Sequence, residues 1–327
     1  MTVSRRTLST VLAMAPLGPR LLRPAPARAQ AAPIPVLATF SILGDIVRNV
    51  GGEAIALEVL VGPDGDAHSY EPTPSDIARV ADATLIFENG IEFETWLDDI
   101  YASSDSAATR VVVTDGLEIH YFGEPNHGGD ALPDGATPEA SSEAEEGGER
   151  DPHVWHDIRN VIGEVAVIRD ALSAADPANA ATYRANADAY TAQLTELDTF
   201  ARAEAAKLPP ERRKLVTSHD ALGYLADAYG FQVVGAALAS FSTETADPSA
   251  GDIADLVEEI RATGVPAIFA ENIEGTDLMR QIADDAGVAL APPLFTDALG
   301  QPGSKGATYV DMVRYDMTTI VTALGGA

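Results

Sequence analysis

The sequence predicts an α/β fold made of two lobes, each with a mostly parallel four-stranded sheet flanked by helices, joined by one long rigid helix. Short apolar runs bounded by Gly, Pro and Asp alternate with helical patterns through both halves of the chain. Such runs are typical of parallel strands that are buried on both faces. Between the two halves, the sequence has the pattern of one long amphipathic helix. The length of 327 residues also suits two domains of about 150 residues each.

Both halves show the same alternation of strands and helices. In the first half, the predicted strands are 34–40, 55–61, 84–88 and 110–114, and the predicted helices are 42–50, 75–83 and 93–103. In the second half, the predicted strands are 214–218, 232–237, 267–270 and 289–295, and the predicted helices are 222–229, 251–263, 276–286 and 308–324. The repeated order predicts one parallel sheet in each half.

The long helix is predicted at 176–208. Asp176 and Pro177 have the pattern of an N-cap followed by proline in the first turn, and a Pro-Pro pair at 209–210 ends the helix. The apolar stripe consists of Tyr183, Ala187, Tyr190, Leu194, Leu197 and Ala201. A dimeric coiled coil would also show such a stripe, but a stiff connector lying against both lobes is the simpler interpretation.

Two further segments have no apolar period. Residues 1–29 have the pattern of a cleavable signal peptide: a basic region with Arg5 and Arg6, a short apolar stretch, and an A-x-A cleavage site at 27–29. The arginine pair fits both the twin-arginine and the general export route. Residues 124–149 are polar and acidic, which predicts a flexible loop.

The predicted organisation is therefore a signal peptide at 1–29 and two lobes with a connector. The N-terminal lobe takes 30–175 and includes the acidic loop, the connecting helix takes 176–208, and the C-terminal lobe takes 209–327. Cleavage after Ala29 would remove five arginines and no acidic residue, which makes the mature chain more acidic still.

Composition excludes several classes of function. The chain has 50 Asp and Glu against 21 Lys and Arg, a formal charge of −29, so nucleic acid is not an expected partner. It has no cysteine, which excludes disulfides, thiolate-ligated metals, thiol nucleophiles and a lipid anchor on an N-terminal cysteine. No apolar stretch reaches the about 20 residues of a spanning helix. We expect a soluble, exported, periplasmic monomer.

Three histidines and one aspartate lie where a binding site is expected. In an open parallel sheet, ligands bind beyond the carboxyl ends of the strands. His68 follows the second predicted strand, His219 ends the strand at 214–218, and Asp297 follows the last strand. His153 lies where the chain returns from the acidic loop. Three imidazoles and one carboxylate make a four-coordinate set suited to Zn²⁺, although each residue alone could be a surface or capping residue.

Several motifs in order resemble a known family. Residues 66–76 read DAHSYEPTPSD, 151–155 read DPHVW, 218–225 read SHDALGYL, and 297–300 read DALG. These motifs resemble those of the TroA-like family, the periplasmic solute-binding proteins of zinc- and manganese-type ABC importers. The resemblance covers essentially the whole mature chain. It implies two α/β lobes joined by one long helix, and an ABC permease in the inner membrane as partner.

The resemblance also implies the metal ligands. It assigns His68, His153, His219 and Asp297 as ligands to one ion. Members that prefer manganese usually have Glu at the position of His219, so the imidazole favours Zn²⁺ over Mn²⁺. Glu71 and Glu271 are nearby carboxylates, which we expect to support the ligands or to pack beside them rather than to bind the ion.

The chain departs from the family pattern at several positions. Ala67 replaces the usual proline before the first ligand. His156 replaces an apolar residue, and we expect it at the surface rather than as an entry ligand. His120 and His127 flank or lie in the acidic loop, which serves either in weak metal capture or as a solvated spacer. The absence of cysteine resembles the AztC-like subgroup, whose members receive metal from a periplasmic metallochaperone.

Two classes of function follow from these residues. The preferred one is a non-enzymatic, high-affinity zinc-binding protein that captures the ion between the lobes and delivers it to the permease. The other is a zinc hydrolase, which would need an open coordination position and a general base, with Glu271 or Glu71 as candidates. Adhesion by a metal-binding homologue is a third possibility that sequence does not separate.

Overall fold

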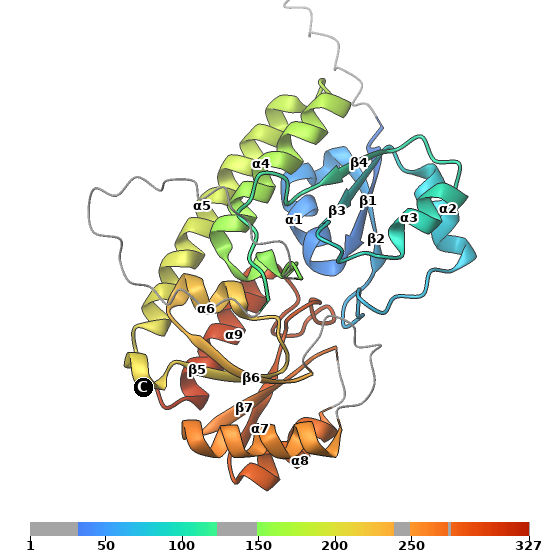
Figure 1. Cartoon of the computed structure of the whole chain (residues 1–327). Coiled ribbons are helices and arrows are strands. Elements are labelled where there is room, and N and C mark those ends of the chain that lie inside the picture. Colours follow the sequence, from blue (N-terminus) through green and yellow to red (C-terminus); the bar gives the residue numbers. More distant parts are fainter. Residues whose placement is uncertain (1–31, 123–148, 239–248, 274–275, 327) are drawn as a thin grey trace, which may run out of the picture. The chain divides into compact units, whose positions relative to one another are not determined.

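A computed structural model describes residues 32–122, 149–238, 249–273 and 276–326. The predicted signal peptide and nearly all of the acidic loop lie outside these residues. The described part forms two α/β lobes (Figure 1). None of its helices is both long and apolar enough to cross a lipid bilayer.

The first lobe contains one four-stranded parallel sheet. Its strands are β1 (Ile34–Phe40), β2 (Ile55–Val61), β3 (Leu85–Glu88) and β4 (Thr109–Val112). Their order in the sheet is β2-β1-β3-β4, with β1 paired to both β2 and β3. All four residues of the inner strand β3 are buried, which agrees with the continuous apolar run in the sequence.

Three helices connect these strands: α1 (Ser41–Gly51), α2 (Pro74–Asp82) and α3 (Leu97–Ser103). A short 3₁₀ turn (Gly52–Ala54) follows α1. Thr73 and Asp76 form a capping box that fixes the start of α2. The helix predicted at 93–103 is present as α3 but begins four residues later, at Leu97, because residues 93–96 form turns.

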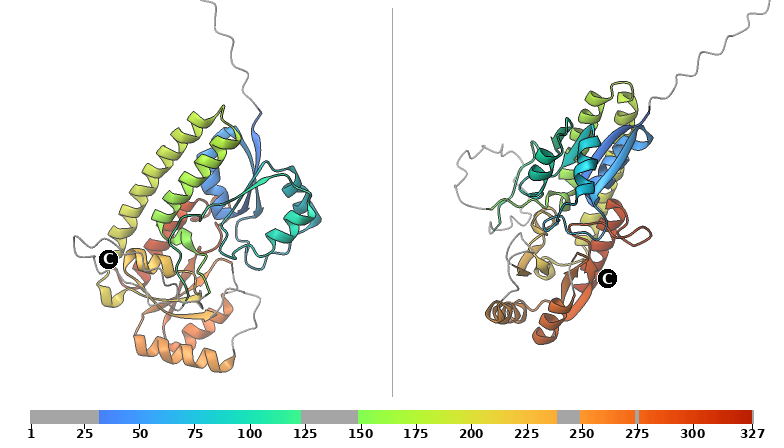
Figure 2. Two further views of the ribbon diagram at one scale, coloured as in Figure 1. Left: turned by 45° about the horizontal axis from the view of Figure 1, so that its top comes forward. Right: turned by 90° about the vertical axis from the view of Figure 1, so that its right-hand side faces the viewer.

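Two long helices follow, α4 (Ile158–Ala175) and α5 (Ala180–Ala205), and they lie side by side (Figures 1 and 2). Sequence patterns predicted no element at α4. The predicted start of the long helix at Asp176 was also wrong. Asp176 ends α4, and its carboxylate accepts hydrogen bonds from Asn179 Nδ2 at 2.6 Å and Tyr183 Oη at 2.9 Å in the intervening turn.

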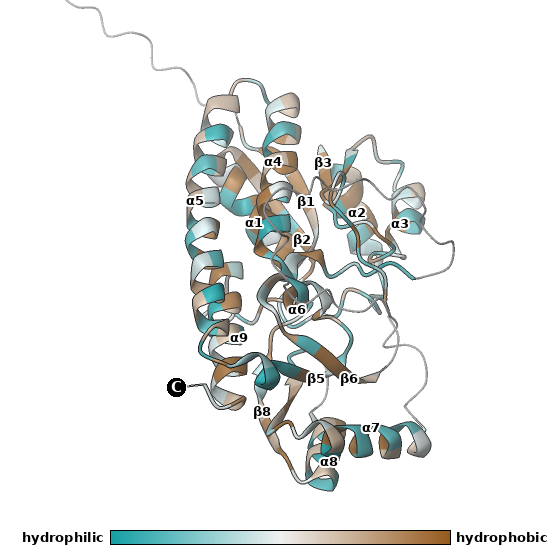
Figure 3. Ribbon diagram, turned by 60° about the vertical axis from the view of Figure 1, so that its left-hand side comes forward, coloured by the Kyte–Doolittle hydropathy of each residue, from teal (hydrophilic) through white to brown (hydrophobic). Residues whose placement is uncertain are grey.

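The predicted apolar stripe of α5 is confirmed, since all six of its residues are buried. This face packs against α1 and α4 of the first half and against α9 of the second half. In Figure 3, hydrophilic residues line much of the visible face of α5, whereas the strands of the first sheet are largely hydrophobic. At about 1.5 Å per residue, its 26 residues span about 39 Å.

The second lobe contains the strands β5 (Lys214–His219), β6 (Gln232–Leu238), β7 (Ala267–Glu271) and β8 (Ala289–Leu294). They form two parallel pairs, β5-β6 and β7-β8, rather than the predicted single sheet. Register shifts occur in both pairs. Where β5 ends, the Glu271 side chain of β7 accepts a hydrogen bond from the backbone N–H of His219 at 3.0 Å, so a side chain replaces a backbone partner there.

The helices of this lobe are α6 (Gly223–Tyr229), α7 (Ala250–Thr263), α8 (Asp277–Ala286) and α9 (Tyr309–Ala323), with a 3₁₀ turn (Pro210–Arg212) before β5. One apolar cluster runs from the first sheet through α4, α5 and α9 to β8. A second, smaller cluster lies between α7, α8 and the strands of the second lobe. The ends of α5 and α9 are therefore anchored in a core shared by both halves.

Candidate metal centre

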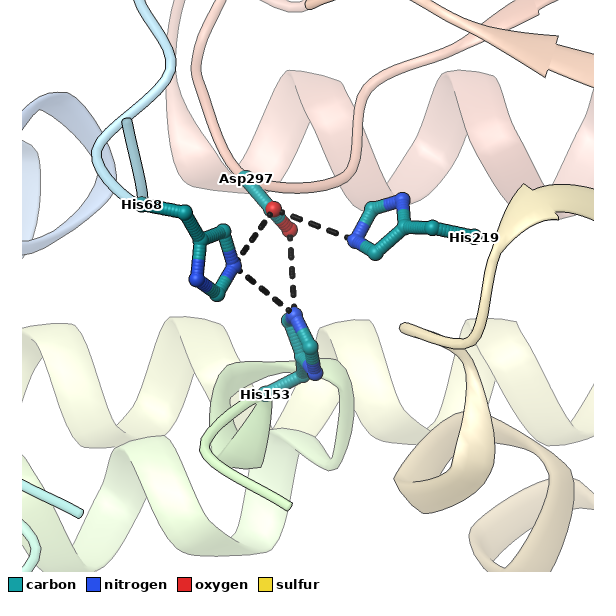
Figure 4. A group of neighbouring side chains, drawn as sticks. All are labelled: His68, His153, His219 and Asp297. Atoms are coloured by element: carbon teal, nitrogen blue, oxygen red, sulfur yellow. Dashed lines mark hydrogen bonds and ion pairs between the residues drawn. The ribbon is translucent and has the colours of Figure 1, made fainter. Parts of the chain in front are cut away.

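The four predicted ligands converge at one place (Figure 4). His68 lies in the loop after β2, and His153 directly precedes a short 3₁₀ turn (Val154–His156) that leads into α4. His219 is the last residue of β5, and Asp297 lies in the loop after β8. Each half of the chain thus contributes two side chains, and three of the four follow or end a strand, as the sequence predicted.

Asp297 is at the centre of the group. Its Oδ2 lies 3.2 Å from Nε2 of His68 and 3.2 Å from Nε2 of His219, and its Oδ1 lies 3.7 Å from Nε2 of His153. The Nε2 atoms of His68 and His153 are 3.3 Å apart. One nitrogen or oxygen from each residue lies within 4.8 Å of the others. An ion at the centre could reach all four donors with small side-chain movements.

The site is buried and rich in acceptors. His153 and Asp297 have no measurable exposure, and His219 is 4% exposed. Both carboxylate oxygens of Asp297 and Nε2 of His219 make no hydrogen bond to the described residues, because their short approaches lack hydrogen-bond geometry. Buried polar atoms without hydrogen bonds are costly. A divalent cation would satisfy them, so the donor set fits a metal ion.

Backbone and aromatic contacts hold His68 in place. The carboxylate of Asp66 accepts a hydrogen bond from the backbone N–H of His68 at 2.8 Å. Trp96 Nε1 donates to the carbonyl of Ala67 at 2.8 Å, which fixes the preceding residue. The ring of Phe93 meets the imidazole of His68 edge-on, with centroids 4.6 Å apart.

Asp151 orients His153. One oxygen of Asp151 accepts from the backbone N–H of His153 at 2.9 Å and lies 2.7 Å from its Nδ1. This contact leaves Nε2 to face Asp297. Burial lowers the pKa of His153 to about 3, so the imidazole is neutral at pH 7, as a metal ligand must be. Burial also raises the pKa of Asp151 to about 7.

Glu271 lies beside the Nδ1 atom of His219 as an ion pair. Its Oε2 lies 2.6 Å from Nδ1 of His219 and accepts a hydrogen bond from Thr296 Oγ1 at 2.6 Å. Burial alone would lower the pKa of His219, but the charges of Glu271 and Asp297 outweigh burial and raise it well above 6.5. Burial likewise opposes ionisation of Asp297, yet the charge of His219 holds its pKa well below the usual range.

The comparison that decides the family covers most of the chain. Residues 36–323 match the family described as zinc-uptake complex component A, periplasmic (ZnuA). The chain belongs to this family. The predicted resemblance to solute-binding proteins of metal ABC importers is thereby confirmed.

Curated relatives of this ZnuA-family chain are named manganese-binding or metal-binding lipoproteins. It is 35% identical over 289 residues to the manganese-binding lipoprotein MntA of Halalkalibacterium halodurans, covering 88% of each chain. It is 31% identical over 295 residues to the manganese ABC transporter substrate-binding lipoprotein PsaA of Streptococcus pneumoniae, again covering 88% of each.

Solved structures show the same fold. The periplasmic zinc-binding protein TroA of Treponema pallidum superposes with a TM-score of 0.74 at 30% identity, covering 88% of this chain and 98% of TroA. A Mn-bound mutant of the periplasmic metal-binding protein of Candidatus Liberibacter asiaticus gives a TM-score of 0.75 at 28% identity with the same coverage. The predicted fold class is therefore confirmed for this family member.

The other residues singled out in the sequence differ in their relation to the four side chains. Glu71 is exposed, so the expectation that it supports or packs beside the ligands was wrong, whereas Glu271 does contact His219. His156 is 5% exposed and packs beside Trp155, so its predicted place at the surface was also wrong. His120 stacks on Tyr224 with ring centroids 4.0 Å apart. His127 lies outside the described residues.

Sequence reasoning missed the residues that tie the two halves together at the site. Trp155 Nε1 donates to the carbonyl of Thr296 at 2.8 Å, next to Asp297. Tyr309 Oη, from the first turn of α9, donates to the carbonyl of Trp155 at 2.7 Å. Asp151 was also missed as a partner of His153. For Asp151 and Trp155 the available signal was their position in the same DPHVW motif as the histidine.

Proposed function

We propose that this protein captures one Zn²⁺ ion through His68, His153, His219 and Asp297 and delivers it to an ABC permease. The convergence of four buried donors from both halves within 4.8 Å carries the proposal. Three imidazoles and one carboxylate match the four-coordinate, nitrogen-rich shell that zinc takes in proteins. The zinc-binding neighbour TroA supports this choice of ion.

Manganese is the second candidate cargo, and the names of several relatives favour it. Mn²⁺ prefers oxygen donors and a larger coordination number, whereas only one of the four side chains here supplies oxygen. Metal analysis of protein purified from the periplasm without chelators tests the cargo. We expect close to one zinc per chain, and a content dominated by manganese would overturn the zinc assignment.

A competition experiment tests the site itself. We expect zinc to displace manganese from the purified protein, and His219→Ala to weaken zinc binding by at least tenfold, because it removes a quarter of the donor set. Undiminished zinc affinity in His219→Ala, or several tight zinc ions per chain, would contradict the proposed site.

The geometry favours binding over hydrolysis. A catalytic zinc keeps an open position for water, and a hydrolase needs a general base nearby. Both oxygens of Glu271 already contact His219 and one also contacts Thr296, and Glu71 is exposed. Neither carboxylate is placed to activate water on the ion. This supports a non-enzymatic, solute-binding role.

The remaining features of the proposal concern export and partners. Residues 1–29 would direct export and be removed, leaving a monomeric, soluble periplasmic protein with lobes at 30–175 and 209–327 joined by 176–208. Relatives are named lipoproteins, but the 327 residues include no cysteine that could carry a lipid. A periplasmic metallochaperone is the proposed metal donor, with His120 and His127 as residues of first capture. N-terminal sequencing of the periplasmic protein tests the cleavage site, expected before Gln30.

A further inference from the structure

A second set of contacts joins the two halves beside the metal centre, at Asn272. This residue directly follows Glu271 at the carboxyl end of β7. Its backbone N–H donates to the carbonyl of Leu294 at 2.9 Å, which fixes it to the end of β8. Its side-chain Nδ2 donates to Oδ1 of Asp64 at 3.0 Å and to the carbonyl of Ala298 at 3.2 Å. One amide group therefore holds two loops that are far apart in sequence.

Each of the two loops carries a proposed metal ligand. Asp64 lies in the loop after β2 (62–73), which carries His68, and Ala298 directly follows Asp297 in the loop after β8 (295–308). These two loops come from different halves of the chain. Their ligands, His68 and Asp297, are only 3.2 Å apart between Nε2 and Oδ2. The amide of Asn272 thus bridges the two loops that carry these residues.

Asp64 also connects the two loops, through both its backbone and its side chain. It adopts a left-handed backbone conformation with φ of 57°, which directs its backbone N–H to the carbonyl of Leu299 at 2.8 Å. Its side chain is exposed, and its carboxylate accepts from Asn272. Within the described residues, Asp64 makes no ion pair with an Arg or Lys side chain. Its carboxylate is therefore directed to the other half of the chain.

We propose that Asn272 and Asp64 form a latch that retains the bound metal ion. The inference rests on the proposed function and assigns Asn272 as a positioning residue for it. Because the ion is held by ligands of both halves, it leaves when the loops of His68 and Asp297 separate. The amide bond to Asp64 opposes that separation. The latch acts on metal release more than on metal entry, since its bonds hold only when the loops are together.

Neighbouring contacts allow the latch to be tested without unfolding the loops. Gln301 Nε2 donates to the carbonyl of Pro63 at 3.1 Å, and the backbone N–H of Leu299 donates to Ser41 Oγ at 2.9 Å. Neither bond involves the Asn272 side chain, so we expect both to remain when that side chain is removed. Asn272 is only partly buried, so its replacement leaves no closed cavity in the core.

The experiment measures the rate at which zinc leaves the protein to a chromophoric chelator in a stopped-flow instrument. We expect Asn272→Ala and Asp64→Gly each to raise the dissociation rate by on the order of threefold to tenfold, the usual effect of one hydrogen bond. Glycine is chosen at 64 because it tolerates the positive φ. Asp64→Asn keeps an acceptor oxygen for Asn272 and is expected to release zinc at nearly the wild-type rate.

The double variant and a matched control complete the design. If the two residues act as one latch, Asn272→Ala with Asp64→Gly releases zinc no faster than the faster single variant. Asn186→Ala is the control, because Asn186 Nδ2 donates to the carbonyl of Val50 at 3.0 Å, away from both loops. The zinc dissociation rate of Asn186→Ala is expected to match that of the wild type. Its melting temperature shows how much stability is lost when an asparagine side-chain hydrogen bond is removed elsewhere in the protein.

The outcomes separate the latch from the proposed function. The latch would be overturned if Asn272→Ala released zinc at the wild-type rate. It would also be overturned if the rate increases of the two single variants multiplied in the double variant. In either case, tight zinc binding that depends on His219 would still support the proposed function. Absence of zinc binding by the wild type, or binding that survives His219→Ala, would overturn both proposals.

Discussion

Two buried carboxylates outside the donor set determine how two of the imidazoles face the site. Asp151 and Glu271 lie 2.7 and 2.6 Å from the Nδ1 atoms of His153 and His219. A carboxylate on one ring nitrogen fixes the tautomer and makes the other nitrogen a stronger donor to a metal. Both Nε2 atoms consequently point toward Asp297. The two histidines share this arrangement although they come from different halves of the chain.

Glu271→Gln tests this role at a single residue. The amide is similar in shape but uncharged, so it no longer polarises His219, and we expect zinc affinity to fall about 10- to 100-fold. The measurement is competition against a chelator of known affinity. Glu71→Gln is the control, since Glu71 is exposed and is not a member of the four-residue cluster in the described structure. Equal zinc affinities of the two variants would show that Glu271 does not tune the site.

At the scale of elements, the sequence predicted best what depends on local pattern. All eight predicted strands match the structure within two residues at each end, because their apolar runs are bounded by Gly, Pro and Asp. The start of α5 was misplaced, because an Asp-Pro pair also stabilises the turn that Asp176 caps. The second lobe has two strand pairs instead of one sheet, and the contact of Glu271 with the end of β5 is not visible in any local pattern.

Helix α4 was missed although it carries a helical stripe. Its buried residues Ile158, Val161, Val165, Ile168 and Leu172 follow three- and four-residue spacings, but β-branched residues and Gly163 weaken the helical signal. Glu164 also lies on the buried side of α4, where a charged residue is unexpected, and is 2% exposed. Its Oε1 has no hydrogen-bond partner among the described residues.

Glu164 is predicted to make stability depend on pH. Burial raises its pKa from 4.5 to about 8, so the folded state holds a proton that the unfolded state loses above about pH 4.5. The contribution of Glu164 to stability therefore falls as the pH rises from about 4.5 to about 8. We expect Glu164→Gln to be more stable than wild type by on the order of 3 kcal/mol at pH 8 and little changed at pH 4.5.

Urea unfolding of the metal-free protein at both pH values measures this difference. Glu196→Gln on the neighbouring helix α5 is the control, because Glu196 is exposed. A Glu164→Gln variant whose advantage is the same at both pH values would show that the carboxyl group of Glu164 does not titrate between them.

At the scale of the whole molecule, the excess of acidic residues has a clear consequence for the cargo. With 50 acidic and 21 basic residues, the chain attracts cations over distances of about a Debye length, about 8 Å at physiological ionic strength. The sequence predicted all four residues of the cluster, because each lies in a short motif and three of them follow or end a strand. The burial of His156, the Asp151 contact and the Asn272 contacts depend on packing between segments distant in sequence, so the sequence could not reveal them.

Metal binding to the whole protein is predicted to release protons, mainly from His219. In the metal-free protein, Glu271 and Asp297 raise the pKa of His219 well above 6.5, so both of its ring nitrogens hold protons at pH 7. The ion must displace the proton on Nε2, while the Nδ1 proton stays with Glu271.

His153, with a pKa of about 3, and Asp297, whose pKa is held low, are already deprotonated and release none. Zinc affinity therefore rises with pH throughout the range below the pKa of His219. Calorimetry in two buffers of different ionisation enthalpy counts the protons, and we expect at least about one per zinc at pH 7. Glu271→Gln lowers the pKa of His219 and should reduce that count, whereas zinc binding without proton release at pH 7 would show that His219 is neutral before the ion arrives.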